Sequence, residues 1–128
     1  MIHETTTGPE IWEQMEGNVD AFVAGVGTGG TISGVGKFLK SKNSKINIVI
    51  ADPVGSVVAD AVNTGSYKYE NGSWLVEGIG EDHIPGNLNL DIIDEGIYVS
   101  DKDAFEMLNK LLHCLLYTSD AADDTPCV

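Results

Sequence analysis

The residues with the clearest chemical potential form a glycine-dense run, Val23-Ala24-Gly25-Val26-Gly27-Thr28-Gly29-Gly30-Thr31. Glycine reaches positive φ and lets the backbone approach an anion closely, so that successive N–H groups converge on the anion while the following helix presents its positive end. Thr28 and Thr31 add hydroxyl donors. The run therefore predicts a site for a phosphorylated ligand.

The glycine spacing alone fits more than one phosphorylated ligand. Gly25, Gly27 and Gly30 match a dinucleotide fingerprint, and Asp52 follows Gly30 by 22 residues, where a ribose-binding acid is expected. An ATP-type P-loop is excluded, because Gly36-Lys37 is followed by Phe38 and has Thr31 at the position of the first glycine. From these residues alone, a nicotinamide dinucleotide, another phosphate and a turn without a ligand all stay open.

The elements around this loop predict a strand, a helix and a second strand. Residues 19–24 have the apolar pattern of a strand buried on both faces, and residues 29–42 have an amphipathic helical period. Residues 45–51 form a β-branched run that Asp52-Pro53 ends. Such a unit makes a parallel strand pair, whose ligands collect at the carboxyl ends of the strands.

Local signals predict further elements on both sides of this unit. We expect a helix over 9–16 opened by a capping box of Thr7 and Glu10, and a short helix to residue 62 capped by Ser56. Asn71-Gly72 predicts a hairpin turn between residues 67–69 and 74–76. Residues 97–99 are an expected strand, and Ser100 to Asp103 form a capping box for a helix to Leu112.

Composition limits the class of function. The 128 residues suffice for one modest domain or part of one, and the net charge of −13, with seven lysines and no arginine, argues against a nucleic-acid partner. No apolar stretch is long enough for a membrane span, and the first residues do not resemble a secretion signal, so a cytoplasmic location is expected. The helical pattern of apolar residues ends abruptly at residue 112, and we expect residues 113–128 to be an unrelated tail after a domain over 1–112.

Three motifs occur together and in order: Thr6-Thr7-Gly8-Pro9-Glu10-Ile11, Gly27-Thr28-Gly29-Gly30-Thr31 and Val76-Glu77-Gly78-Ile79-Gly80-Glu81-Asp82. With them the chain resembles the cystathionine β-synthase and cysteine synthase family over residues 2 to 112. The resemblance implies a partial domain of the tryptophan synthase β-like fold, a three-layer α/β arrangement around a mostly parallel sheet. It also implies pyridoxal 5'-phosphate as the cofactor.

The resemblance assigns roles to two of these motifs. Gly27, Thr28, Gly29, Gly30 and Thr31 would hold the cofactor phosphate, which backbone N–H groups and hydroxyls at a helix N-terminus can bind without arginine. Gly78, Ile79 and Gly80 would lie beside the cofactor ring. The resemblance further implies amino-acid substrates and a homodimeric parent enzyme.

The implied reaction is a β-replacement. The segments 52–56 and 74–82 look more like cystathionine β-synthase, which joins serine and homocysteine, than like cysteine synthase, which uses O-acetylserine and sulfide; His83 departs from the family's usual aromatic residue. The family's Schiff-base lysine is expected upstream of Met1. No lysine here takes its place, so the isolated chain is expected to be inactive.

Other residues with chemical potential have simpler explanations. His3 and His83 are expected to be structural or exposed, and Trp12 and Trp74 to serve packing. Glu77, Glu81 and Asp82 are typical of solvated loop acids, and no metal site is expected.

Overall fold

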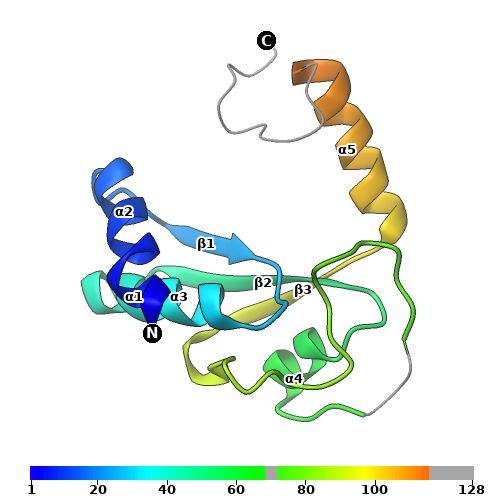
Figure 1. Ribbon diagram of the computed structural model, residues 1–128, viewed down its shortest axis with the longest axis horizontal. Coiled ribbons are helices and arrows are strands. Elements are labelled where there is room, and N and C mark those ends of the chain that lie inside the picture. Colours follow the sequence, from blue (N-terminus) through cyan, green and yellow to red (C-terminus); the bar gives the residue numbers. More distant parts are fainter. Residues whose placement is uncertain (69–71, 116–128) are drawn as a thin grey trace.

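A parallel β-sheet forms the centre of the structure, a computed structural model that describes residues 1–68 and 72–115. Within these residues the sheet has three strands, β1 (Ala21–Ala24), β2 (Asn47–Pro53) and β3 (Glu95–Val99), in the order β1-β2-β3. Both neighbouring pairs are parallel, with Phe22 opposite Ile48 and Ala51 opposite Ile97. The predicted α/β class with a parallel sheet is confirmed (Figure 1).

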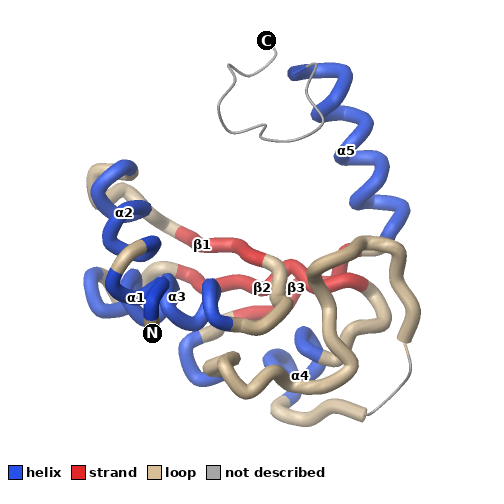
Figure 2. The backbone as a smooth tube through the Cα atoms, in the orientation of Figure 1, coloured by secondary structure: helices blue, strands red, loops and turns tan. Residues whose placement is uncertain are grey.

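Helices occupy most of the connections between the strands. Helix α3 (Gly30–Lys42) joins β1 to β2, and α4 (Val58–Thr64) follows β2, as the periodicity predicts. Before β1 lie α1 (Ile2–Thr5) and α2 (Thr7–Gln14), and a 3-10 turn, η1 (Leu90–Ile92), precedes β3. Figure 2 shows α1 to α4 close to the sheet, whereas α5 (Asp101–Leu115) extends away from it.

The core lies between one face of the sheet and these helices. Ile48 and Ile50 of β2 are fully buried against Ile32, Val35 and Leu39 of α3. Burying a side chain of this size stabilises the fold by about 1.5–3 kcal/mol. This packing fixes α3, and with it the glycine loop at its N-terminus.

The other face of the sheet is open in the described part of the chain. Val23 of β1 and Ile97 of β3 point to this face and are 57% and 46% exposed. The expectation that residues 19–24 are buried on both faces is therefore wrong for β1. Phe22 and Ala24 pack on the core, but none of α1 to α4 covers the side of Ala21 and Val23.

The predicted N-caps had different outcomes. At Ser100, the hydroxyl oxygen accepts from the Asp103 N–H at 3.1 Å, as the capping box predicts. The capping box at Thr7 is wrong, because α2 already includes Thr7 and the Thr7 hydroxyl lies 2.8 Å from the His3 ring.

At α4, two side chains near the helix start take part in capping. Ser56 is only a weak cap, 3.4 Å from the Val58 N–H, and Asp52 accepts from the Ala59 N–H at 2.8 Å. The stronger cap therefore comes from the end of β2 rather than from the residue next to the helix.

Two further expectations concern residues that the structure describes only in part. Residues 67–68 and 74–76 do not form strands, so the predicted hairpin is wrong for the described flanks, and Asn71 lies outside the described residues. Helix α5 continues to Leu115, past the expected domain end at residue 112. Residues 116–128 lie outside the described part, and the division at 112 stays a prediction.

Over the described residues, no helix has both the length and the apolar character that crossing a bilayer requires.

Candidate phosphate and cofactor site

The glycine loop connects the carboxyl end of β1 to the N-terminus of α3. Gly29 precedes the helix with φ +79°, and the first helical backbone hydrogen bond runs from Ser33 N to Gly29 O at 3.2 Å. The preceding N–H groups, those of residues 30–32, therefore lie outside the helical hydrogen-bond ladder. No side chain caps this end of α3, unlike the end of α5 at Ser100. An uncapped helix N-terminus behind a glycine loop has free donors for an anion.

The second predicted motif lies directly against this loop. The Gly80 N–H donates to Val26 O at 2.8 Å. A Cβ atom added at Gly27 would lie 3.0 Å from Gly78 O, and one added at Gly25 would lie 2.6 Å from Ile79 Cγ2. The fold thus brings together two glycine motifs that are far apart in the sequence, and their roles toward the cofactor stay predictions.

Contacts that the sequence does not reveal hold the Gly78-Ile79-Gly80 segment. Trp74 donates from its indole Nε1 to Ile79 O at 2.9 Å, so this residue positions the segment in addition to packing. On the other side, the Ser56 hydroxyl accepts from the Glu81 N–H at 3.0 Å and lies 3.1 Å from Glu81 O. An aromatic residue close before a glycine pair is the only signal of this role in the sequence.

The segment before η1 supports the start of α3 from another side. A Cβ atom at Gly29 would lie 2.8 Å from Leu88 Cβ, so a larger residue at position 29 would collide with this segment. The Asn89 N–H donates to the Ser33 hydroxyl at 2.9 Å. These contacts fix the loop between two later parts of the chain.

His3 also contacts the glycine loop. Its Nε2 atom lies 3.5 Å from the Thr31 hydroxyl, and its Nδ1 atom lies 2.8 Å from the Thr7 hydroxyl. The ring therefore links α1, α2 and the start of α3. The sequence gives His3 no partner, and the structure places its ring between Thr7 and Thr31.

Asp52 does not take part in this site. Its side chain is fully buried, and one carboxylate oxygen accepts from the Ala59 N–H at the start of α4. Burial is the largest influence on its pKa and raises it above the usual range, against the hydrogen bonds from Ala59, Ser56 and Val58. A ribose-binding acid must face the ligand. The dinucleotide alternative required Asp52 to bind the ribose, and it is therefore wrong on this requirement.

The described lysines near the loop have acidic partners. Lys37 forms an ion pair with Glu4 at 2.9 Å, and Lys40 forms one with Asp94 at 2.7 Å. Lys37 is largely exposed, as expected, but it also ties α3 to α1. Neither amine is free at the glycine loop.

Three neighbouring side chains, Glu81, Asp82 and His83, bring possible ligand atoms within 4.8 Å of one another. Asp82 and His83 are exposed, and their side chains contact each other at 2.7 Å. The hydrogen bond to Asp82 is the main cause that raises the pKa of His83. A chance group of solvated loop acids accounts for this arrangement, and we assign no metal to it.

The chain is an α/β domain in which a glycine loop precedes an uncapped helix N-terminus on the carboxyl side of a parallel sheet, an arrangement that suits an anion. The family model of the pyridoxal-phosphate dependent enzymes matches residues 2–118. This chain belongs to that pyridoxal-phosphate dependent enzyme family.

Curated relatives agree with the family assignment. The chain is 40% identical over 113 residues to cysteine synthase A of Salmonella typhi and of Escherichia coli (strain K12), which covers 87% of this chain and 35% of each relative. It is 45% identical over 111 residues to the cysteine synthase of Staphylococcus aureus (strain N315), which covers 86% of this chain and 34% of the relative. The chain thus spans about a third of the length of these relatives.

Proposed function

We propose that the whole protein is a pyridoxal-phosphate-dependent cysteine synthase, which forms cysteine from O-acetylserine and sulfide. The observation that carries this proposal is the identity of 40–45% to cysteine synthases over most of the chain. The sequence motifs favour the cystathionine β-synthase branch, with cysteine synthase as the alternative, but these relatives favour the alternative. The proposal also includes amino-acid substrates, a homodimeric enzyme and a cytoplasmic location.

The described residues fit the phosphate of this cofactor. The uncapped N-terminus of α3 and the Thr28 and Thr31 hydroxyls supply neutral donors, which suit a phosphate in a chain without arginine. A Cβ atom at Gly30 would meet only the Thr28 hydroxyl, at 3.8 Å, so this side of the loop has room for an anion.

The chain's own residues would bind and orient the cofactor. Pyridoxal phosphate, when bound, supplies the electron sink for replacement at the β-carbon of an amino acid. In our proposal the glycine loop holds the phosphate, and the backbone of Gly78 and Gly80 borders the ring without side chains. Trp74 and Ser56 fix that backbone through Ile79 and Glu81. Binding of the cofactor's phosphate at the glycine loop would then help to orient the cofactor's ring.

A substrate comparison on the full-length enzyme tests this function. The enzyme from the whole reading frame that contains this chain is assayed with O-acetylserine plus sulfide, and with serine plus homocysteine. We expect cysteine from the first pair to form faster by at least about tenfold, equivalent to about 1.4 kcal/mol. Faster formation of cystathionine from the second pair would reject the proposal in favour of the other branch.

A second experiment concerns the isolated chain. With pyridoxal phosphate and borohydride, we expect no specific lysine to be trapped, because the two lysines of α3 nearest the glycine loop, Lys37 and Lys40, are paired with Glu4 and Asp94. Mass spectrometry of the digested chain provides the readout. A single stoichiometric lysine adduct would contradict the expectation that no lysine of this chain takes the place of the family's Schiff-base lysine.

A further inference from the structure

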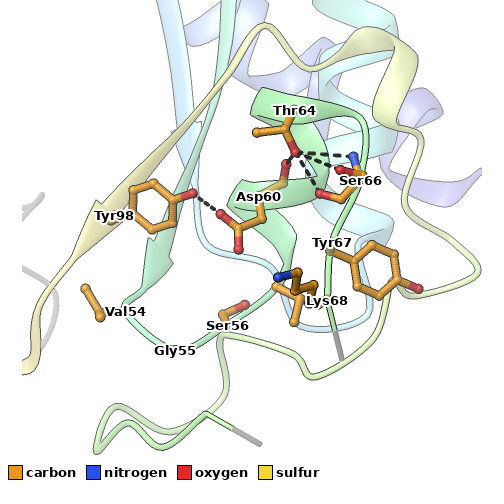
Figure 3. A pocket seen from close by; sticks show the side chains of 10 residues that line it. Val54, Gly55, Ser56, Asp60, Thr64, Ser66, Tyr67, Lys68 and Tyr98 are labelled. Atoms are coloured by element: carbon orange, nitrogen blue, oxygen red, sulfur yellow. Dashed lines mark hydrogen bonds between the residues drawn. The ribbon is translucent and has the colours of Figure 1, made fainter. Parts of the chain in front are cut away.

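A polar cavity lies beside α4, apart from the glycine loop. It has a volume of about 550 Å³, and its walls come from the turn after β2, the outer side of α4, the segment that follows α4, and Tyr98 of β3. Figure 3 shows Asp60 between Tyr98 on one side and Lys68 and Tyr67 on the other. None of its lining residues belongs to the two glycine motifs.

The carboxylate of Asp60 is fixed in this cavity. The Tyr98 hydroxyl donates to Asp60 Oδ1, and this hydrogen bond is the main cause that raises the pKa of Tyr98, which keeps the hydroxyl protonated. The second oxygen, Oδ2, makes no hydrogen bond or ion pair to any described residue. A carboxylate with one oxygen already bonded can still accept a hydrogen bond from a ligand at its other oxygen.

A cation and a phenol complete the polar lining. Lys68 forms no ion pair within the described part of the chain, with Asp60 or with any other acid, although both side chains line the same cavity. The Tyr67 hydroxyl likewise makes no hydrogen bond to a described residue, and Tyr67 is 40% exposed.

The other polar side chains of the cavity are already occupied. The Thr64 hydroxyl donates to the backbone oxygens of Asp60 and Ser66, the Ser66 hydroxyl lies 3.4 Å from the Thr64 hydroxyl, and Ser56 bonds to Glu81. The side-chain groups available to a ligand near Asp60 are therefore one carboxylate oxygen and the ammonium group of Lys68, because the Tyr67 hydroxyl points away from both (Figure 3).

The charges limit the kind of ligand. A simple anion would be repelled by Asp60 and by the net charge of −13, and a simple cation would be repelled by Lys68. A zwitterion can satisfy both groups at once. The remaining walls, including the exposed Val54 and the rings of Tyr67 and Tyr98, suit an apolar side chain.

We propose that this cavity binds a small zwitterion of the α-amino-acid class with an apolar side chain. Its ammonium group donates to Asp60 Oδ2, its carboxylate accepts from Lys68, and the ring of Tyr67 adds apolar wall. The site is separate from the cofactor site, and it does not depend on the proposed activity.

The test uses three ligands that share the leucine side chain and differ in which charged groups they carry. L-Leucine is the zwitterion, L-leucine methyl ester is the matched cation, and 4-methylpentanoate is the matched anion. Each is titrated into the isotope-labelled chain and followed by backbone amide NMR. We expect saturable shifts with L-leucine at residues 54–68 and at Tyr98, and affinities about tenfold weaker for the two singly charged ligands.

Variants separate this site from general surface binding. D60N keeps an acceptor for Tyr98 but removes the charge, and K68Q removes the cation; each should weaken L-leucine binding by about tenfold. K102Q is the control, because Lys102 is exposed on α5 and, among the described residues, pairs only with Glu106. Amide spectra that stay unchanged outside the cavity show that each variant is folded.

Two results would overturn the proposal. One is equal affinity for all three ligands, which would indicate nonspecific contact. The other is L-leucine binding that stays the same in D60N and K68Q, or that shifts only residues 27–31 and 78–80. The substrate assay of the whole enzyme is independent of both results, so this proposal and the proposed function can fail separately.

Discussion

Gly80 shows how a single residue depends on distant parts of the chain. Its φ is +87°, and a Cβ atom there would lie 2.5 Å from Pro53 Cγ and 2.8 Å from Trp74 Cε2. Its N–H donates to Val26 O beside the glycine loop. A side chain at this position would therefore disturb the end of β2 and the site together.

We expect Gly80→Ala to lower the free energy of unfolding by about 1–3 kcal/mol, because the positive φ and the close contacts both oppose a Cβ atom. Urea unfolding of the chain measures this change. The matched control is Gly86→Ala, where nothing lies within 4 Å, and its effect should stay within about 0.5 kcal/mol. Equal effects of the two substitutions would refute this role of Gly80.

His3 is the second residue whose role depends on tertiary contacts. We expect His3→Ala to increase amide hydrogen exchange in the first turn of α3 about two- to fivefold, because Thr31 and Thr7 lose their common partner. NMR exchange rates at Ile32 and Ser33 measure the effect. Thr5→Ala is the control, since within the described part of the chain the Thr5 hydroxyl bonds only to Ile2 O of α1. Unchanged rates in His3→Ala would show that His3 does not position the loop.

At the scale of elements, side chains from later segments fix the ends of helices and strands. Asp94 connects three elements just before β3: its carboxylate lies 2.7 Å from Lys40 Nζ at the end of α3 and accepts from the Ile48 N–H of β2 at 2.7 Å. Its own N–H donates to Ile48 O at 2.8 Å. Asp52 similarly connects the end of β2 to the start of α4.

We expect Asp94→Asn to destabilise the fold by about 1 kcal/mol at neutral pH, a value reduced for the partial exposure of the pair. Partial burial raises the pKa of Asp94, but the hydrogen bonds from Ile48 and Lys40 outweigh it and leave the pKa below 3.8. A lowered carboxyl pKa stabilises the fold above the unfolded pKa, and this stabilisation disappears as the pH falls through the folded pKa.

The pH dependence of unfolding measures this contribution. The difference between wild type and Asp94→Asn should be constant above about pH 5 and should shrink below about pH 4. Lys102→Gln, which removes the exposed Lys102–Glu106 pair, serves as the control and should change stability little at any pH. A difference that persists unchanged at low pH would show that the charge of Asp94 is not the cause.

At the scale of the whole molecule, apolar surface is distributed unevenly. The open face of the sheet includes Val23 and Ile97, and α5 carries exposed Phe105, Leu108 and Leu111. In Figure 1, α5 stands away from the sheet, so these surfaces do not cover each other. Exposed apolar side chains gathered on a sheet face and on a helix favour association.

We expect the chain to self-associate as its concentration rises, because its exposed apolar side chains attract one another. Association should be stronger at high salt, because salt screens the repulsion from the net charge of −13. Sedimentation velocity at low and high salt measures this. Leu108→Lys with Leu111→Lys should shift the chain toward monomer, while Glu106→Gln on the same helix should not. A monomer at all concentrations and salt levels would contradict this expectation.

The sequence by itself determined the order of the helices and strands in the central unit, the glycine loop and the family, because these depend on local periodicity and on short motifs. Local chemistry also predicted the Ser100 cap correctly. Local chemistry failed at Thr7, where His3 takes the hydroxyl, and at residues 19–24, where only one face is covered.

Only the tertiary structure decided which distant residues meet. It placed Gly78 and Gly80 against the glycine loop, buried Asp52 under α4 and put His3 beside Thr31. It also brought Asp60, Lys68 and Tyr98 around one cavity. The physical reason is that hydrogen bonds within a turn or helix depend on neighbouring residues, whereas these contacts depend on how helices pack on the sheet.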